Sequence, residues 1–113
     1  MVTKEQLIRA IYKFIDNDMI PRAEGNYKII LNVAKAALNH KADGIFEAIK
    51  NNSLVAMFGV IDENDNVDVD LLANVLSDGL GSDEYMLTFK FLTSTYSLGI
   101  SASDIQTIKR YAM

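Results

Sequence analysis

The chain has 113 residues, half of them hydrophobic, and it contains no cysteine and a single histidine. A chain of this length and apolar content can bury a stable core without disulfides or a structural metal, so we expect one globular domain over residues 1–113. The lack of cysteine excludes disulfides, thiolate nucleophiles and cysteine-ligated metal centres.

The formal net charge of −4 is unevenly spread along the chain. Residues 1–50 carry eight Lys or Arg against six Asp or Glu, whereas residues 51–113 carry three against nine. The acidic back half argues against nucleic-acid binding, because phosphate contacts need cations. The first residues are charged where a signal peptide would be apolar, and no apolar run approaches the roughly 18 residues of a membrane span. We therefore expect a cytoplasmic protein with no nucleic-acid or membrane partner.

The chain opens with a predicted helix. Thr3 and Gln6 fit a capping box, and apolar residues then recur at helical spacing as far as Ile15. Pro21, the only proline, suits the first turn of a new helix. We expect this second helix over about residues 22–39.

The second helix is apolar around most of its circumference, because residues such as Ile29 and Val33 widen its hydrophobic face. A helix of this kind is either central in the fold or shared with another subunit. Ile29 and Val33 are therefore candidate contacts for a partner chain.

Three shorter helices are expected around the middle of the chain. Ser, Asp and Asn favour helix starts because their side chains accept hydrogen bonds from free backbone amides, and glycine favours helix ends. The expected caps are Asp43, Ser53 and either Asp68 or Asp70, and the expected helix stops are Gly79 and Gly81.

The clearest strand signal lies at residues 85–92, where Tyr85, Leu87 and Phe89 alternate with residues of the opposite face. A weaker strand over residues 96–100 completes an antiparallel hairpin. This aromatic face could instead stack nucleic-acid bases, but such platforms are flanked by Lys and Arg, and only Lys90 is present here. We expect core packing, with an outer strand edge left for pairing with another chain.

A closing helix, with Ser103 and Gln106 as its capping box, completes the expected fold. The fold class is α+β and predominantly helical, with about five helices and a small C-terminal antiparallel β-hairpin.

The segment from Asp62 to Asp70 is dense in carboxylates and amides. Four of its side chains match the first ligand positions of an EF-hand calcium loop: Asp62, Asn64, Asn66 and Asp70. The match fails at Val67, where the loop wants glycine, and at Ala73, where it wants a bidentate glutamate. A polar turn followed by a helix cap accounts for most of these carboxylates without any ligand.

No reactive constellation is apparent in the sequence. His40 is alone, the serines lie outside any Gly-x-Ser-x-Gly elbow, and the glycines form no phosphate-binding loop. We expect no enzyme activity and no cofactor.

The sequence therefore favours a non-enzymatic protein–protein interaction module that self-associates, with Tyr85, Leu87, Phe89, Lys90, Ile29 and Val33 as candidate contacts. Its small size and lack of motifs suit a phage or mobile-element accessory protein. Two alternatives stay open. One is a divalent-cation-binding protein that uses residues 62–70, and the other is an acidic inhibitor that mimics nucleic acid.

Overall fold

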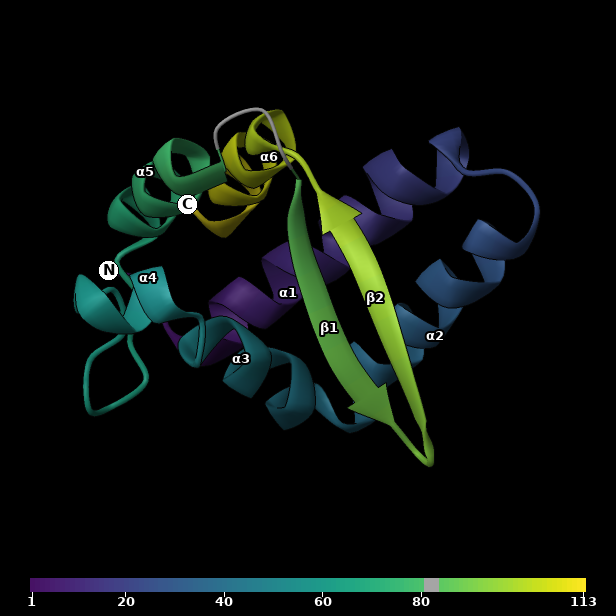
Figure 1. Ribbon diagram of the computed structural model, residues 1–113, viewed down its shortest axis with the longest axis horizontal. Coiled ribbons are helices and arrows are strands. Elements are labelled where there is room, and N and C mark those ends of the chain that lie inside the picture. The colour runs from purple at the N-terminus through teal and green to yellow at the C-terminus, as the bar shows by residue number, and fades with distance from the viewer. Residues whose placement is uncertain (81–83) are drawn as a thin grey trace.

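The computed structural model describes residues 1–80 and 84–113 of the chain. Figure 1 shows a hairpin lying across a layer of helices, which confirms the expected α+β, mainly helical class. The main elements are α1 (Lys4–Phe14), α2 (Asn26–His40), α3 (Ala42–Lys50), α4 (Ser53–Met57), α5 (Val69–Leu80), β1 (Tyr85–Phe91), β2 (Ser94–Ile100) and α6 (Ala102–Ala112).

Between α1 and α2 the chain forms a π-helix, η1 (Ile15–Met19), and a 3₁₀ turn, η2 (Ile20–Arg22). The second helix therefore begins at Asn26, later than predicted, and Pro21 belongs to the short turn before it. The π-helix has a packing consequence, since it buries Ile15 and Met19 while Asp16 and Asn17 between them are exposed.

The capping box of Thr3 and Gln6 is confirmed. Two other predicted caps are wrong. Asp43 lies in the first turn of α3 and forms an ion pair with Lys4, and α4 is capped by Asn52, whose side chain accepts hydrogen bonds from two backbone amides. The neighbouring Asn52 caps α4 in place of Ser53, whereas α3 begins after Lys41 without a side-chain cap.

The ends of α5 and α6 also differ from expectation. Asp68 caps α5 as predicted, through a 3.1 Å bond from the Leu71 amide. This helix continues past Gly79 to Leu80, and Gly81 lies outside the described residues. The last capping box uses Ser101 and Asp104 in place of Ser103 and Gln106, because α6 starts earlier than its apolar pattern indicates.

The hairpin pairs β1 with β2 in a regular antiparallel register over all seven residues of each strand, with no bulge. Tyr85, Leu87 and Phe89 face inward, opposite Ile100, Leu98 and Tyr96, and the rings of Phe89 and Tyr96 stack at 5.7 Å. The predicted burial of the aromatic face is confirmed. A two-stranded hairpin is marginal by itself, so this inner face needs the helices beneath it.

The core joins the hairpin to the helices. β1 packs against α3, while α6 packs against both α1 and α5. Among the described residues the fully buried side chains are all hydrophobic, and the largest of them include Phe14 and Phe46. No helix in the described ranges is long and apolar enough to cross a bilayer.

The hairpin turn provides a stability test. Leu92 has a φ of +57° and its side chain is 77% exposed, so a bulky residue occupies a left-handed conformation without burying its surface. Leu92→Gly should raise the free energy of unfolding by about 1 kcal/mol, because relief of the strain exceeds the added flexibility of the unfolded chain. Urea unfolding measures this change. Thr93→Gly is the matched control and should lower stability, because Thr93 has no positive φ.

Candidate interaction surface

The acidic segment folds as a tight turn around Asp62. The Oδ1 atom of Asp62 accepts hydrogen bonds from the backbone amides of Asn64 and Asn66, each at 2.9 Å. Asp65 takes a left-handed conformation with a φ of +62°, which aspartate tolerates in turns. These contacts are the ones expected of a polar turn.

The remaining carboxylates of the segment contact other elements. Asp65 pairs with Lys50 at 2.8 Å, and Asp70 pairs with Lys109 of α6 at 2.7 Å. Of the four expected cation ligands, Asp62 and Asn66 lie side by side, while Asp70 is held by that lysine. In the part of the chain that the structure describes, no three His, Asp or Glu side chains form a group that could hold a metal ion. Cation binding here stays a hypothesis.

Ion pairs also link the basic front half to the acidic back half. Besides the Lys50–Asp65 pair, Arg22 contacts Asp104 at 3.3 Å. The hydrogen bond to Asp65 raises the pKa of Lys50, since the charged ammonium is the form that the carboxylate stabilises. The charge asymmetry of the sequence is therefore reduced in the folded chain.

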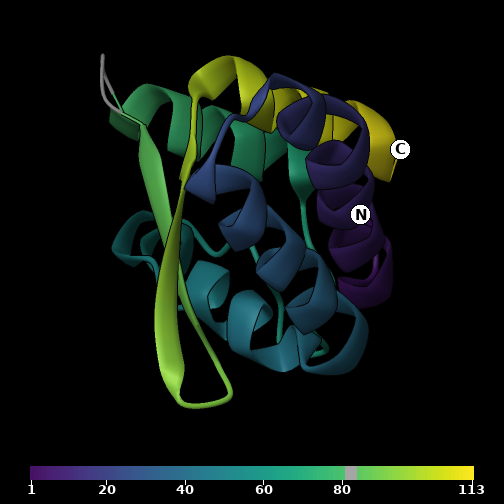
Figure 2. The same ribbon diagram turned by 90° about the vertical axis from the view of Figure 1, so that its right-hand side faces the viewer.

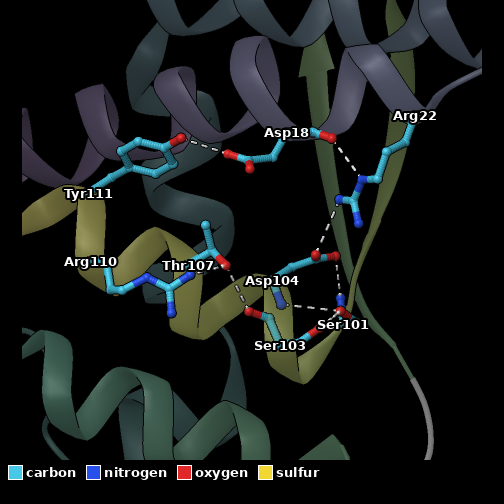
Figure 3. A network of polar contacts seen from close by, with 8 residues as sticks. All are labelled: Asp18, Arg22, Ser101, Ser103, Asp104, Thr107, Arg110 and Tyr111. Atoms are coloured by element: carbon cyan, nitrogen blue, oxygen red, sulfur yellow. Dashed lines mark hydrogen bonds and ion pairs between the residues drawn. The ribbon is translucent and has the colours of Figure 1, made fainter.

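A polar network joins α6 to the η1–η2 segment (Figure 3). The hydroxyl of Tyr111 donates to Asp18 at 2.8 Å, and the Nε atom of Arg22 donates to the Asp18 carbonyl at 2.7 Å. Arg22 also reaches Asp104, which belongs to the capping box of α6 with Ser101. The bond between Tyr111 and Asp18 joins residues that are 93 positions apart in the sequence. We call this network, which fixes the C-terminal helix to the η1–η2 segment, the clamp.

The network does not resemble a hydrolytic site. Ser101 and Ser103 bond to each other at 3.0 Å, and Ser101 also caps α6 by accepting a hydrogen bond from the Asp104 amide. The only histidine, His40, is exposed at the end of α2. The hydrogen bond to Asp18 raises the pKa of Tyr111, because loss of the phenol proton would place two negative charges together. These contacts have the geometry of a structural clamp.

The space that the described residues enclose beneath the hairpin is small. A cavity of about 30 Å³ lies among α1, α5, α6 and β1, lined by side chains such as Leu7, Leu76 and Ile108. That is room for about one water molecule, far below the several hundred Å³ of a small-molecule site.

The predicted contact residues divide into two groups. Tyr85, Leu87 and Phe89 lie in the core, where burial raises the pKa of the Tyr85 phenol. Lys90 is exposed on the outer face of β1. On α2, Ile29 is 62% exposed and Val33 is half-buried. The structure therefore brings none of the aromatic candidates to the surface that a partner could reach.

The outer edge of β2 is a feature that the residue-level prediction missed. The hairpin closes on the pair Phe91 and Ser94, and in a two-residue hairpin this closing pair is hydrogen-bonded. The alternation of an antiparallel ladder then directs the backbone N–H and C=O groups of Thr95, Ser97 and Gly99 away from β1. Within the described residues, no backbone hydrogen bond reaches these groups from another element.

A groove of about 470 Å³ runs beside this edge. Figure 2 shows the start of α2 reaching close to β2, with α1 on the other side of α2. One wall of the groove is formed by Met19, Ala23 and Tyr27, and the other includes Ser97 and Gly99 of β2. The open strand edge therefore lies inside a defined groove.

We call this groove and the open edge of β2 the β2 seat; it is lined by Met19, Arg22, Ala23, Tyr27, Glu84, Met86, Ser97, Gly99 and Asp104. A larger groove of about 540 Å³ lies between α1 and the α2–α3 junction, where Lys4 and Asp43 form their ion pair. Of these two grooves, the β2 seat is the one whose described lining includes strand residues. Its sequence signal was the absence of charge and proline from β2, residues 94–100.

Comparisons of this chain with protein-family models, with curated proteins and with solved structures give no match.

The turn at Asp62 can be tested for a structural role. Asp62→Ala should lower the free energy of unfolding by about 1 kcal/mol in buffer with a calcium chelator, because two backbone amides lose their acceptor. Glu63→Ala is the matched control, since Glu63 is exposed beside Asp62 and should have little effect. Urea unfolding measures both. If added calcium stabilises the parent chain and not Asp62→Ala, the segment is a cation site as well as a turn.

The clamp at Tyr111 predicts a pH dependence. The pKa of Tyr111 is raised in the folded chain, so the stability that it adds is complete below the ordinary tyrosine pKa of about 10 and is lost as pH rises through the folded value. Tyr111→Phe should therefore unfold at lower urea concentration than the parent at pH 7, and this difference should shrink above pH 10. A difference that stays constant to pH 11 contradicts the role of the Asp18 bond.

Proposed function

We propose that this chain is a non-enzymatic protein–protein interaction module that contacts its partner through the β2 seat. The single observation that carries the proposal is the uncharged, unbulged outer edge of β2, whose backbone groups at Thr95, Ser97 and Gly99 lack partners in the described structure.

Exposed strand edges template pairing with other chains, and proteins usually blunt them with lysine, proline or a bulge. β2 has none of these over residues 94–100, whereas β1 carries Lys90 and packs against α3. Strand addition to such an edge is a common way to bind an extended segment, with backbone hydrogen bonds supplying affinity. The asymmetry between the two strands supports β2 as the binding edge.

The polar side chains support an interaction role over a reaction. Asp18, Arg22 and Tyr111 form a clamp, Asp104 and Ser101 cap a helix, and each has a stabilising partner. A catalytic group needs a free acceptor or donor aimed at a substrate. The free donors and acceptors here are backbone groups at the edge of β2, and such groups can pair with the backbone of another chain.

Self-association is a second form of the proposal, favoured by one observation on α2. Ile29 is an aliphatic side chain left 62% exposed, and Val33 lies one turn further along the same flank. Such a pair fits a helix of a second copy. Light scattering over a concentration series tests this form, and a chain that stays monomeric at high concentration removes it.

Position-specific photocrosslinking tests the proposed function directly. A photoreactive p-benzoylphenylalanine placed at Ser97 should give a covalent adduct with a protein when the chain is expressed in its native cells. The same group at Thr88 is the matched control, because Thr88 faces Ser97 across the hairpin and their hydroxyls bond at 2.9 Å, so both replacements lose one contact. We expect adduct from position 97 and little from position 88.

The outcomes of the crosslinking are distinct. An adduct of twice the mass of the chain identifies a second copy as the partner, and any other mass identifies a different protein. Equal yields from the two positions, or no adduct from either, would remove the β2 seat as the contact surface. Circular dichroism of both variants establishes that each is folded before the comparison.

A further inference from the structure

We infer that the groove between α1 and the α2–α3 junction binds a dipeptide with apolar side chains, and that Glu5 and Arg9 recognise its two charged termini. We call it the α1 groove. The inference is independent of the proposed function, because this groove and the β2 seat share no lining residue.

The α1 groove has the size of a small-molecule site. Its volume of about 540 Å³ falls within the range of about 300–1,000 Å³ that is usual for such sites. The end of α2 and the start of α3 form one wall. The other wall is one face of α1, whose lining residues follow the helical spacing i, i+3, i+4 and i+7: Glu5, Ile8, Arg9 and Tyr12.

Contacts between the two walls bound the groove at both ends. At one end, Lys4 of α1 forms an ion pair with Asp43 of α3. At the other end, the ammonium of Lys35 on α2 lies 5.4 Å from the centre of the Tyr12 ring. The stretch of α1 from Lys4 to Tyr12 is about 12 Å long, at 1.5 Å per residue. A peptide held between these contacts is therefore limited to about three extended residues.

The middle of the groove carries one charge of each sign without a partner. Glu5 and Arg9 are exposed, and neither forms an ion pair with another described residue. One helical step of i, i+4 separates them, which is about 6 Å along the axis of α1. The groove therefore suits a zwitterion whose ammonium and carboxylate stand about 6 Å apart.

A dipeptide matches this spacing. Two extended residues span at most about 7 Å, so the terminal ammonium can reach Glu5 while the terminal carboxylate reaches Arg9. A guanidinium also binds a carboxylate through two parallel hydrogen bonds. A free amino acid carries both charges on one carbon atom and is too short to meet both side chains.

The rest of the lining favours apolar side chains on the dipeptide. Ile8, Tyr12 and Ala42 line the groove and are only half-buried, so each keeps apolar surface that a ligand can cover. Leucine side chains would cover this surface while the two termini keep their charged partners.

Titration of the full chain with leucyl-leucine, followed through the backbone amide signals in NMR spectra, tests the inference. Saturable shifts should be confined to α1, the end of α2 and the start of α3. N-acetyl-leucyl-leucine and leucyl-leucine amide should each bind about tenfold more weakly, because each lacks one charged terminus. Free leucine should also bind more weakly than the dipeptide.

Two charge variants separate the termini. In Arg9→Gln, leucyl-leucine should bind about tenfold more weakly, and its amide should bind as well as the free acid. In Glu5→Gln, the acetylated and the free amine forms should bind equally. Lys13→Gln removes another exposed cation of α1 that lies outside the groove, so it is the matched control and should bind like the parent chain.

Four results would overturn the inference. They are shifts that do not saturate, equal binding of the free and blocked dipeptides, equal weakening by Arg9→Gln and Lys13→Gln, and a preference for free leucine. None of them bears on crosslinking at Ser97, because that position lines the β2 seat.

Discussion

The dependence of the two-stranded hairpin on the helices beneath it governs this structure. Each strand pairs with the other along one edge and leaves its outer edge without a strand partner. A hairpin this small is marginal in water unless one face is packed against other elements. The inward residues Leu87, Phe89 and Leu98 are almost completely buried, so the hairpin is held by side-chain packing on one face. That packing fixes the position of β2 without using its outer backbone groups. The stability of the hairpin and the openness of its edge thus have the same origin.

The positioning of the edge depends on the segment between α1 and α2. The π-helix η1 buries Met19, and the turn that follows brings Ala23 and Tyr27 alongside β2. Asp18 and Arg22 of the same segment contact α6, which directly follows β2 in the chain. The clamp therefore ties the segment that lines one side of the groove to the helix that follows β2.

Local sequence patterns predicted those parts of the fold that depend on local rules. The alternation at Tyr85, Leu87 and Phe89 identified β1 and its buried face, because side-chain period alone decides which face is apolar. The box at Thr3 and Gln6 was also predicted correctly. The failures at Ser53 and Ser103 have a common cause. A capping residue stood one or two positions earlier in each case, and choosing between them requires knowing where the helix can start against its neighbours.

The candidate surface was predicted only in outline, for a physical reason. Alternation indicates that one face of a strand is buried, but it carries no information about which edge remains unpaired. The predicted contacts Tyr85, Leu87 and Phe89 were drawn from the buried face, whereas the edge consists of backbone groups that every residue type possesses. The groove depends further on Ala23 and Tyr27, which are more than 60 positions from β2 in sequence. The sequence predicted an open outer edge because the hairpin has only two strands, but it did not identify the residues of that edge.

An unprotected edge strand is a hazard as well as a binding site, because sheets can grow from it without limit. The usual protections act on the strand itself and would also block a partner. Here the start of α2 lies close to β2, and Tyr27 and Ala23 belong to the lining of the groove. On the proposed function, this neighbouring helix limits the access of other chains to the edge. The protection of an uncharged β2 then comes from the neighbouring helix, and the strand keeps its outward-facing hydrogen-bonding groups.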